Sequence, residues 1–136
     1  MIIRICMTNQ QIWKEKLPED YSFLGGRSLT SQLLLDEVDP VCHPLGPENK
    51  LIIAPGLLGG TSAPCSGRIS VGAKSPLTGG IKESNAGGTA GRKLARLGIR
   101  ALIIEGQPQG QLQKKSEGDA IYILKVTNQK NRNYSG

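Results

Sequence analysis

Glycine-rich stretches and one arginine are the residues whose types and spacing best suit ligand binding. Residues 59–64 lead into Gly67-Arg68, and residues 84–88 read Ser-Asn-Ala-Gly-Gly. Glycines allow backbone N–H groups to approach a ligand closely, because no Cβ atom stands in the way. An arginine can hold a phosphate through two parallel hydrogen bonds. These residues therefore predict a surface for a polar, phosphate-bearing ligand.

The spacing disfavours nucleotide hydrolysis and nucleophilic catalysis. The text nearest to a P-loop, residues 87–94, has the wrong glycine spacing and lacks the Lys-Ser/Thr pair that meets phosphate and Mg²⁺. The dinucleotide fingerprint Gly-x-Gly-x-x-Gly is absent from the sequence. Cys42 and the single histidine, His43, are adjacent, so in an extended segment their side chains point apart and form a poor nucleophile–base pair.

The elements that must position these residues are those of an α+β domain, with mixed β-sheets and two principal helices. Strands and helices do not alternate strictly, which favours this class over a doubly wound α/β sheet. Leu29, Leu33 and Leu34 share one face of the first expected helix. Three acidic residues near its end are expected to face solvent: Asp36, Glu37 and Asp39. The expected strands are residues 2–7, 11–16, 50–54, 68–73, 100–105 and 120–126, and the expected helices are residues 27–38 and 85–97.

The start of the second expected helix bears directly on ligand binding. Asn85 is placed to cap its N-terminus, or to lie just before the cap. A helix N-terminus favours an anionic group. Gly98 suits the left-handed position that ends such a helix. We therefore expect an anion to bind where Arg68 and the helix beginning near Asn85 come together.

The composition indicates a single basic domain of a reducing compartment. The chain has 136 residues and a formal net charge of +6, and its basic clusters are expected to be solvated surface. Aromatic residues make up 4%, so a nucleic-acid partner is disfavoured. Three widely spaced cysteines do not form a disulfide scaffold, and neither a secretory signal nor a membrane span is recognised. We therefore expect a cytoplasmic protein without membrane contact.

Long motifs in unbroken order, from about residue 2 to about residue 126, resemble the N-terminal region of the tungsten-dependent aldehyde:ferredoxin oxidoreductases. The longest are Pro-Leu-Gly-Pro-Glu-Asn-Lys-Leu-Ile at residues 44–52 and Lys-Ser-Pro-Leu-Thr-Gly at residues 74–79. The others are residues 23–27, 36–38, 60–64, 67–68, 85–88 and 103–106, with Gly98. The resemblance implies that residues 1–126 are part of the family's α+β domain. Residues 127–136 have almost no apolar content and are expected to be a frayed polar tail.

The resemblance also implies a cofactor and the residues that contact it. The family's N-terminal domain is a base for a bis-molybdopterin tungsten cofactor, which oxidises aldehydes to carboxylic acids and passes electrons to ferredoxin. Arg68 matches the arginine that contacts the phosphate region of the cofactor near a [4Fe–4S] cluster. Asn85 matches the asparagine whose backbone carbonyl helps to hold the Mg²⁺ between the pterin phosphates. Gly87 matches a glycine near the pterin, and Ala86 and Gly88 complete the cofactor-binding motif.

The sequence departs from the family in ways that affect its activity. The family's catalytic chain is several times longer, and its cluster cysteines lie in later domains. Cys6, Cys42 and Cys65 cannot supply the four ligands of a [4Fe–4S] cluster. Residues 110–119 differ from the usual continuation, Pro55 replaces a small residue, and Thr89-Ala90 replace an aromatic pair. We therefore expect the chain alone to be inactive as an aldehyde oxidoreductase.

Two functional interpretations follow. In the first, the chain contributes one wall of the tungstopterin site, and its partner is the cysteine-bearing remainder of the enzyme, in the same or another subunit. In the second, it is a noncatalytic, stand-alone relic that binds an anion or a partner protein. Residues 51–53 and 102–104 are expected to form strands buried on both faces, and in the family the covering surface comes partly from the rest of the chain. We therefore expect self-association through an unpaired sheet edge or an exposed apolar patch. The sequence leaves open which aldehyde is used and whether the metal is tungsten or molybdenum.

Overall fold

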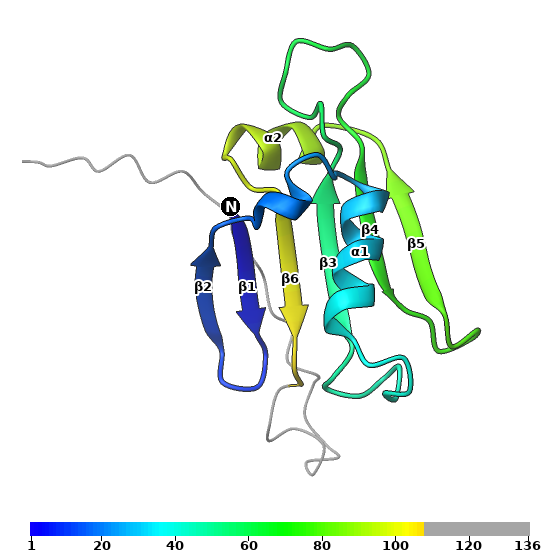
Figure 1. The fold of residues 1–136 in the computed structure, drawn as a ribbon. Helices are drawn as coiled ribbons and strands as arrows, with labels where there is room; N and C mark the ends of the chain where they lie inside the picture. The colour runs from blue at the N-terminus through cyan, green and yellow to red at the C-terminus, as the bar shows by residue number, and fades with distance from the viewer. Residues whose placement is uncertain (108–136) are drawn as a thin grey trace, which may run out of the picture.

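The computed structural model describes residues 1–107, and within them six strands form one mixed sheet in the order β2-β1-β6-β3-β4-β5 (Figure 1). Neighbouring strands are antiparallel except β1 and β6, which run parallel. The strands are β1 (Ile2–Cys6), β2 (Gln11–Glu15), β3 (Lys50–Pro55), β4 (Ile69–Lys74), β5 (Ile81–Ala86) and β6 (Ala101–Glu105). The helices are α1 (Arg27–Glu37), α2 (Ala90–Arg96) and a 3₁₀ turn (Glu19–Tyr21). This arrangement confirms the predicted α+β class.

Helix α1 covers one face of the sheet and forms the main core with it (Figure 1). The predicted apolar stripe is confirmed, since Leu29, Leu33 and Leu34 are all buried. They pack in one cluster with residues of β3 and β6 such as Ile52. Gly72 of β4 allows the helix to approach, because a Cβ atom there would lie 3.0 Å from the Cβ of Thr30. The helix is therefore fixed against the centre of the sheet.

The other face of the sheet carries a second, smaller cluster. Ile3, Ile5 and Leu102 are buried there, packed with Leu94 of α2 and with Ile99 beyond it. The predicted burial of residues 51–53 on both faces is wrong in part. Ile52 is fully buried, whereas Leu51 is 40% exposed. Side chains alternate along β3, so Leu51, near the start of the strand, points to the face opposite α1.

The boundary of the second helix differs most from the prediction. Residues 81–86, which include Asn85, form strand β5, and α2 begins only at Ala90 after an N-cap at Thr89. The expected role of Asn85 as a helix cap is therefore wrong. Strand β5 lies at the edge of the sheet and is mostly polar and exposed, so it lacks the apolar alternation that marks a strand in sequence.

Other boundaries follow the prediction closely. Gly98 has the predicted left-handed conformation, with φ of +74°. The hairpin of β1 and β2 is confirmed with Ile2 opposite Glu15. The expected strand at 120–126 and the expected tail at 127–136 lie outside the described residues. Within residues 1–107, no helix has the length and apolar character needed to cross a membrane.

Candidate functional site

The loop between β3 and β4 packs against α2 at one end of the sheet, at the top of Figure 1. A Cβ atom at Gly91 would lie 2.6 Å from the carbonyl oxygen of Gly67 and 2.7 Å from that of Arg68. A Cβ atom at Gly60 would lie 3.1 Å from the Cβ of Ala95. Glycines at these positions therefore allow the loop and the helix to meet backbone to backbone. We call this part of the molecule, residues 56–68 and 87–96, the loop end.

A half-open pocket of about 410 Å³ lies between this loop and α2. Residues 61–67 form one wall, and Gly88, Thr89, Arg92 and Arg96 form the other. Arg92 and Arg96 are exposed, and within residues 1–107 neither guanidinium has a hydrogen-bond or ion-pair partner. The pocket therefore presents two free cationic groups to a ligand.

Arg68 lies directly before β4, at the same end of the sheet. Its carbonyl oxygen accepts a hydrogen bond of 3.1 Å from the N–H of Gly56, which fixes its backbone. Its side chain is exposed and has no partner in the part of the chain that the structure describes, and it does not line the 410 Å³ pocket. Positions 87 and 88 are open, since a Cβ atom at either glycine would have nothing within 4 Å. Space for a ligand therefore remains beside this backbone.

The side chain of Asn85 is held by internal contacts. Its Oδ1 accepts a hydrogen bond of 2.7 Å from the hydroxyl of Ser70, the residue opposite it in β4. Its Nδ2 donates to Oε2 of Glu83 at 3.2 Å, and the same oxygen accepts from Nε of Arg27 at 2.8 Å. Both ends of the Asn85 amide are thus occupied. The contacts fix the strand that leads into Gly87-Gly88 and leave the amide unavailable as a ligand-binding group.

The structure brings some of the predicted site residues together. Strand pairing places Ile69 opposite Ala86, so Arg68 and Gly87 follow at the same end of β4 and β5. The predicted meeting of Arg68 with a helix N-terminus at Asn85 does not occur, because α2 starts beyond Gly88. Arg92 and Arg96 were expected only as solvated surface, and their place in a pocket depends on the loop that folds over them.

Comparison with known proteins identifies the domain. The sequence profile described as "Aldehyde ferredoxin oxidoreductase, N-terminal domain" matches residues 2–131. The chain belongs to this family. It is 46% identical over 109 residues to the tungsten-containing aldehyde ferredoxin oxidoreductase of Thermococcus kodakarensis and 47% identical to that of Pyrococcus furiosus. These matches cover 79% of this chain and 18% of each relative, so the chain spans less than a fifth of their length.

A solved structure has the same fold. It is the active site complex BamBC of benzoyl coenzyme A reductase, in complex with 1,5-dienoyl-CoA. The similarity has a TM-score of 0.74 at 33% sequence identity, and it covers 79% of this chain and 17% of that chain. The sheet described above is therefore shared by this aldehyde ferredoxin oxidoreductase N-terminal domain and a reductase.

The two longest family motifs of this chain have structural roles. Asn49 donates from Nδ2 to the carbonyl of Pro44 at 2.6 Å and to that of Lys74 at 3.1 Å. The ammonium of Lys74 is buried and donates to the carbonyls of Pro40 and Cys42, the latter at 2.6 Å. The motifs at 44–52 and 74–79 thus hold one loop of the family domain against the end of β4.

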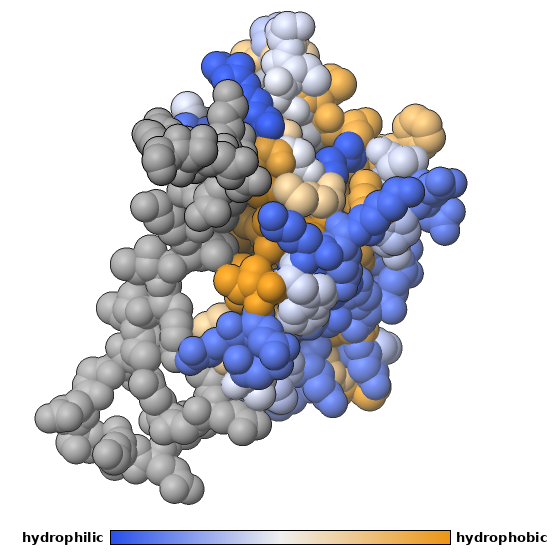
Figure 2. All heavy atoms as spheres, turned by 90° about the vertical axis from the view of Figure 1, so that its left-hand side faces the viewer, coloured by the Kyte–Doolittle hydropathy of each residue, from blue (hydrophilic) through white to orange (hydrophobic). Residues whose placement is uncertain are grey.

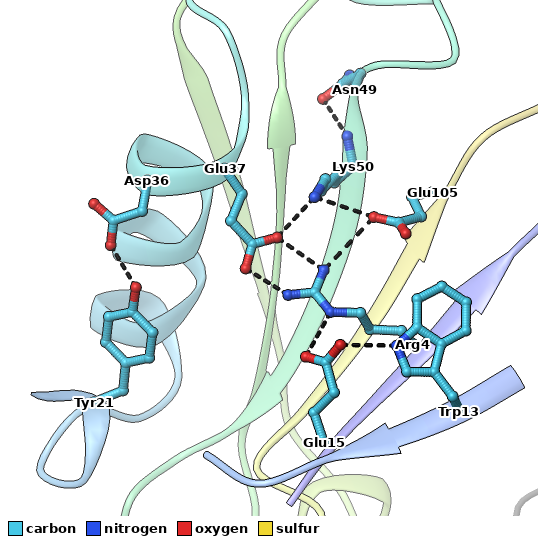
Figure 3. Close-up of polar contacts among 9 residues, drawn as sticks. All are labelled: Arg4, Trp13, Glu15, Tyr21, Asp36, Glu37, Asn49, Lys50 and Glu105. Atoms are coloured by element: carbon cyan, nitrogen blue, oxygen red, sulfur yellow. Dashed lines mark hydrogen bonds and ion pairs between the residues drawn. The ribbon is translucent and has the colours of Figure 1, made fainter. Parts of the chain in front are cut away.

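An ion-pair cluster lies where α1 and β6 end and β3 begins, at the other end of the sheet from the loop end. Figure 3 shows its contacts. Arg4 donates two hydrogen bonds to Glu37, at 2.8 and 2.6 Å, and one to Glu15 at 2.8 Å. Lys50 lies 2.7 Å from Glu37 and 3.1 Å from Glu105. These five residues are called the charged cluster below. The expectation that Glu37 faces solvent is wrong, because the helix end turns its side chain over β1 and β3.

The charged cluster changes the titration of its members. Burial raises the pKa of the Glu37 carboxyl, but the hydrogen bonds from Arg4 and Lys50 outweigh burial and leave that pKa below its ordinary value. The hydrogen bond from Arg4 also lowers the pKa of Glu15. Nearby, the hydrogen bond that Tyr21 donates to Asp36 raises the pKa of Tyr21 to about 12. The carboxylates of Glu37 and Glu15 are therefore ionised at neutral pH.

The remaining chemistry-bearing residues lie apart from one another. His43 is exposed, and its Nδ1 accepts a hydrogen bond from the N–H of Leu45. Cys6, Cys42 and Cys65 are free. Among residues 1–107, no group of three His, Cys, Asp or Glu side chains lies close enough to hold a metal ion. Among the described residues, the loop end combines a pocket with exposed, unpaired arginines, which suits the binding of an anion.

Proposed function

We propose that this chain supplies one wall of a bis-molybdopterin tungsten site in an aldehyde:ferredoxin oxidoreductase-like enzyme. The observation that carries the proposal is the unpartnered Arg68 beside the open backbone of Gly87-Gly88, in a domain of this family. The relatives that the chain matches are named tungsten-containing aldehyde ferredoxin oxidoreductases. The enzyme would oxidise aldehydes to carboxylic acids in the cytoplasm, with ferredoxin as the electron acceptor.

The geometry suits a phosphate-bearing cofactor in three respects. The Arg68 guanidinium would hold a phosphate group through paired hydrogen bonds. Gly87 and Gly88 would let the pterin approach the backbone, since no side chain occupies that space. The backbone carbonyl of Asn85 would contribute to a Mg²⁺ site, and the contacts to Ser70 and Glu83 would hold that carbonyl in a constant orientation. Ala86 lies between Asn85 and Gly87 in the chain.

The cofactor, when bound, supplies a metal centre that accepts two electrons from the aldehyde. Electrons then need a route to ferredoxin, and the family's route is a [4Fe–4S] cluster. The three cysteines of this chain are too few for four cluster ligands. The proposal therefore requires a partner that carries the cluster ligands, and the chain alone is expected to show no aldehyde oxidation.

Reconstitution would test this proposal. The full chain would be combined with a polypeptide comprising the Pyrococcus furiosus relative without its matching N-terminal segment. Tungsten would be measured by mass spectrometry, and the pterin by fluorescence after oxidation. We expect the complex to retain both, and Arg68→Ala to retain several-fold less, whereas Lys82→Ala, an exposed residue of β5, should retain the normal amount. Equal retention by the Arg68 and Lys82 variants would contradict the proposal.

A stand-alone binding module is the second candidate function. It is favoured by the pocket between residues 61–67 and α2, because this pocket presents the exposed guanidinium groups of Arg92 and Arg96 to an anion. In that case the chain would bind an anion or a partner protein without tungsten. Binding of a simple anion by the isolated chain, together with failed reconstitution, would support this candidate over the first.

Self-association is compatible with either candidate function, and it would involve one of the two edge strands, β2 or β5. Strand β2 has Ile12 60% exposed and Trp13 36% exposed. Figure 2 views the molecule from this side and shows mainly hydrophilic residues around a smaller apolar area. Charged and polar side chains on an edge oppose strand addition, and the other edge strand, β5, is mostly polar and exposed. We therefore propose that self-association uses the exposed apolar side chains of β2, and light scattering that finds only monomers would contradict it.

A further inference from the structure

The charges of the loop end are unbalanced. Between residues 49 and 104 the sequence contains a single acidic residue, Glu83. Its Oε2 contacts Nε of Arg27 and Nδ2 of Asn85, and Glu83 is not among the residues that line the 410 Å³ pocket. None of the residues that line the 410 Å³ pocket is acidic, and Arg92 and Arg96 both line it. The positive charge of this pocket is therefore not neutralised by the described residues.

The shape of the pocket points to a small anionic ligand. Arg92 and Arg96 are four residues apart on α2, so their side chains project from the same face of the helix. The facing wall, residues 61–67, consists of small and polar residues without an aromatic ring, so it offers no platform on which a nucleic-acid base could stack. A volume of about 410 Å³ is within the usual range for small-molecule sites.

The two guanidinium groups together carry the charge that balances a dianion. Each has a planar set of N–H donors that pairs with phosphate oxygens in a bidentate manner. A carboxylate carries one charge and two oxygens, and it would leave most of these donors unused. A phosphate monoester or a diphosphate satisfies more of them. The chemistry of the pocket therefore favours a phosphoryl group over a carboxylate.

We propose that the Arg92–Arg96 pocket is an anion site separate from Arg68, which takes the phosphoryl group of a small phosphate-bearing molecule. The two positions are distinct because Arg68 does not line the pocket. This inference does not depend on the proposed tungstopterin function. Free phosphate, diphosphate and larger phosphate-bearing molecules share the recognised chemistry, and the experiment below separates them.

Calorimetric titration of the full chain would test the inference, with inorganic phosphate, pyrophosphate and acetate as probes in a buffer without phosphate. We expect pyrophosphate to bind more tightly than phosphate, and acetate to bind at least about ten-fold more weakly than either. Arg92→Gln and Arg96→Gln should each weaken pyrophosphate binding about ten-fold or more, as expected for the loss of a hydrogen bond between charged groups. Both residues are exposed, so their loss should not prevent folding.

Two further variants make the result specific. Lys82→Gln removes the same charge from an exposed position that does not line the pocket, and it should change the affinity less than two-fold. Pyrophosphate should still bind to the Arg68→Ala variant, and that binding should still depend on Arg92 and Arg96. If Lys82→Gln weakened binding as much as Arg92→Gln, diffuse charge would explain the result and the pocket would be rejected. If only Arg68→Ala weakened it, the inference would fail while the role proposed for Arg68 survived.

Discussion

Arginines at the two ends of this domain have opposite surroundings. Arg4 is only 13% exposed and contacts Glu15, Glu37 and Glu105, whereas Arg92 and Arg96 are exposed and contact no acidic residue that the structure describes. A buried cation without a partner is costly, so Arg4 requires its glutamates. An exposed cation is solvated and can remain unpaired. Arginine therefore forms a partly buried ion-pair network at one end of the domain, and at the other end it remains available to bind a ligand.

Glycines differ in the same way within the loop end. Gly67 and Gly91 are required by packing, because each has backbone oxygen atoms where a Cβ would stand. Gly87 has open space around that position. A glycine-rich sequence thus contains both packing glycines and glycines that leave room for a ligand, and only the structure separates the two kinds.

The largest expected effect is the loss of Glu37. Glu37→Ala leaves Arg4 and Lys50 half-buried with fewer partners, and Arg4 loses two hydrogen bonds. We expect the free energy of unfolding to fall by about 3 kcal/mol, the lower part of the range for a broken buried ion pair, because the cluster is partly open to water. Urea denaturation would measure it. A loss below about 1 kcal/mol would show that the charged cluster is an ordinary surface network.

The next largest effect concerns the contact between the loop and α2. Gly91→Ala places a methyl group 2.6 Å from the oxygen of Gly67, and the backbone must move. We expect a loss of about 2 kcal/mol, typical of overpacking, although alanine is the better helix former. Gly87→Ala is the matched control and should change stability by less than about 0.5 kcal/mol. Similar losses for both variants would mean that the two glycines do not differ as described.

Acid should weaken the charged cluster selectively. The pKa values of Glu37 and Glu15 are lowered on folding, so the unfolded chain binds protons more readily than the folded chain. Their contribution to stability is complete above the ordinary value of about 4.5 and is lost as pH falls through the lower pKa of the folded state. Melting temperatures between pH 6 and pH 3 should therefore decline more steeply for the wild type than for Glu37→Gln. Parallel curves would contradict this role of Glu37.

The smallest expected effect is that of the free arginines on folding. Arg92→Gln and Arg96→Gln remove no contact within residues 1–107, so the free energy of unfolding should change by less than about 0.5 kcal/mol. Urea denaturation in a buffer without phosphate would measure it. A loss of 1 kcal/mol or more in either variant would show that the arginine supports the fold, and the contrast with Arg4 would disappear.

Much of the fold could be predicted from the sequence, since apolar periodicity marks α1 and the central strands. Strand β5 was missed because an edge strand with polar side chains on both faces carries no such signal. Because of this error, Asn85 was predicted at the start of a helix, whereas it lies in strand β5. The error arose because Gly87-Gly88 directly follows the last residue of β5, Ala86, and because Asn is a common residue at helix caps.

The candidate site was predictable in part. Arg68 and residues 85–88 were found from the motifs, and strand pairing places them at one end of the sheet. The pocket at Arg92 and Arg96 could not be predicted, because a loop that lacks periodicity forms its other wall. The charged cluster was also missed, since Arg4, Glu37 and Glu105 are far apart in sequence. They meet only through the pairing of β1 with β6 and the packing of α1 on the sheet.

The central claim is that ligand binding belongs to the loop end and that the charged cluster serves only the fold. Nuclear magnetic resonance of the isotope-labelled full chain, titrated with pyrophosphate, tests this most directly. We predict that amide shifts change in residues 61–67 and 88–96, with no change at Arg4, Glu37 or Lys50. Shift changes centred on the charged cluster, or spread equally over both ends of the sheet, would contradict the account.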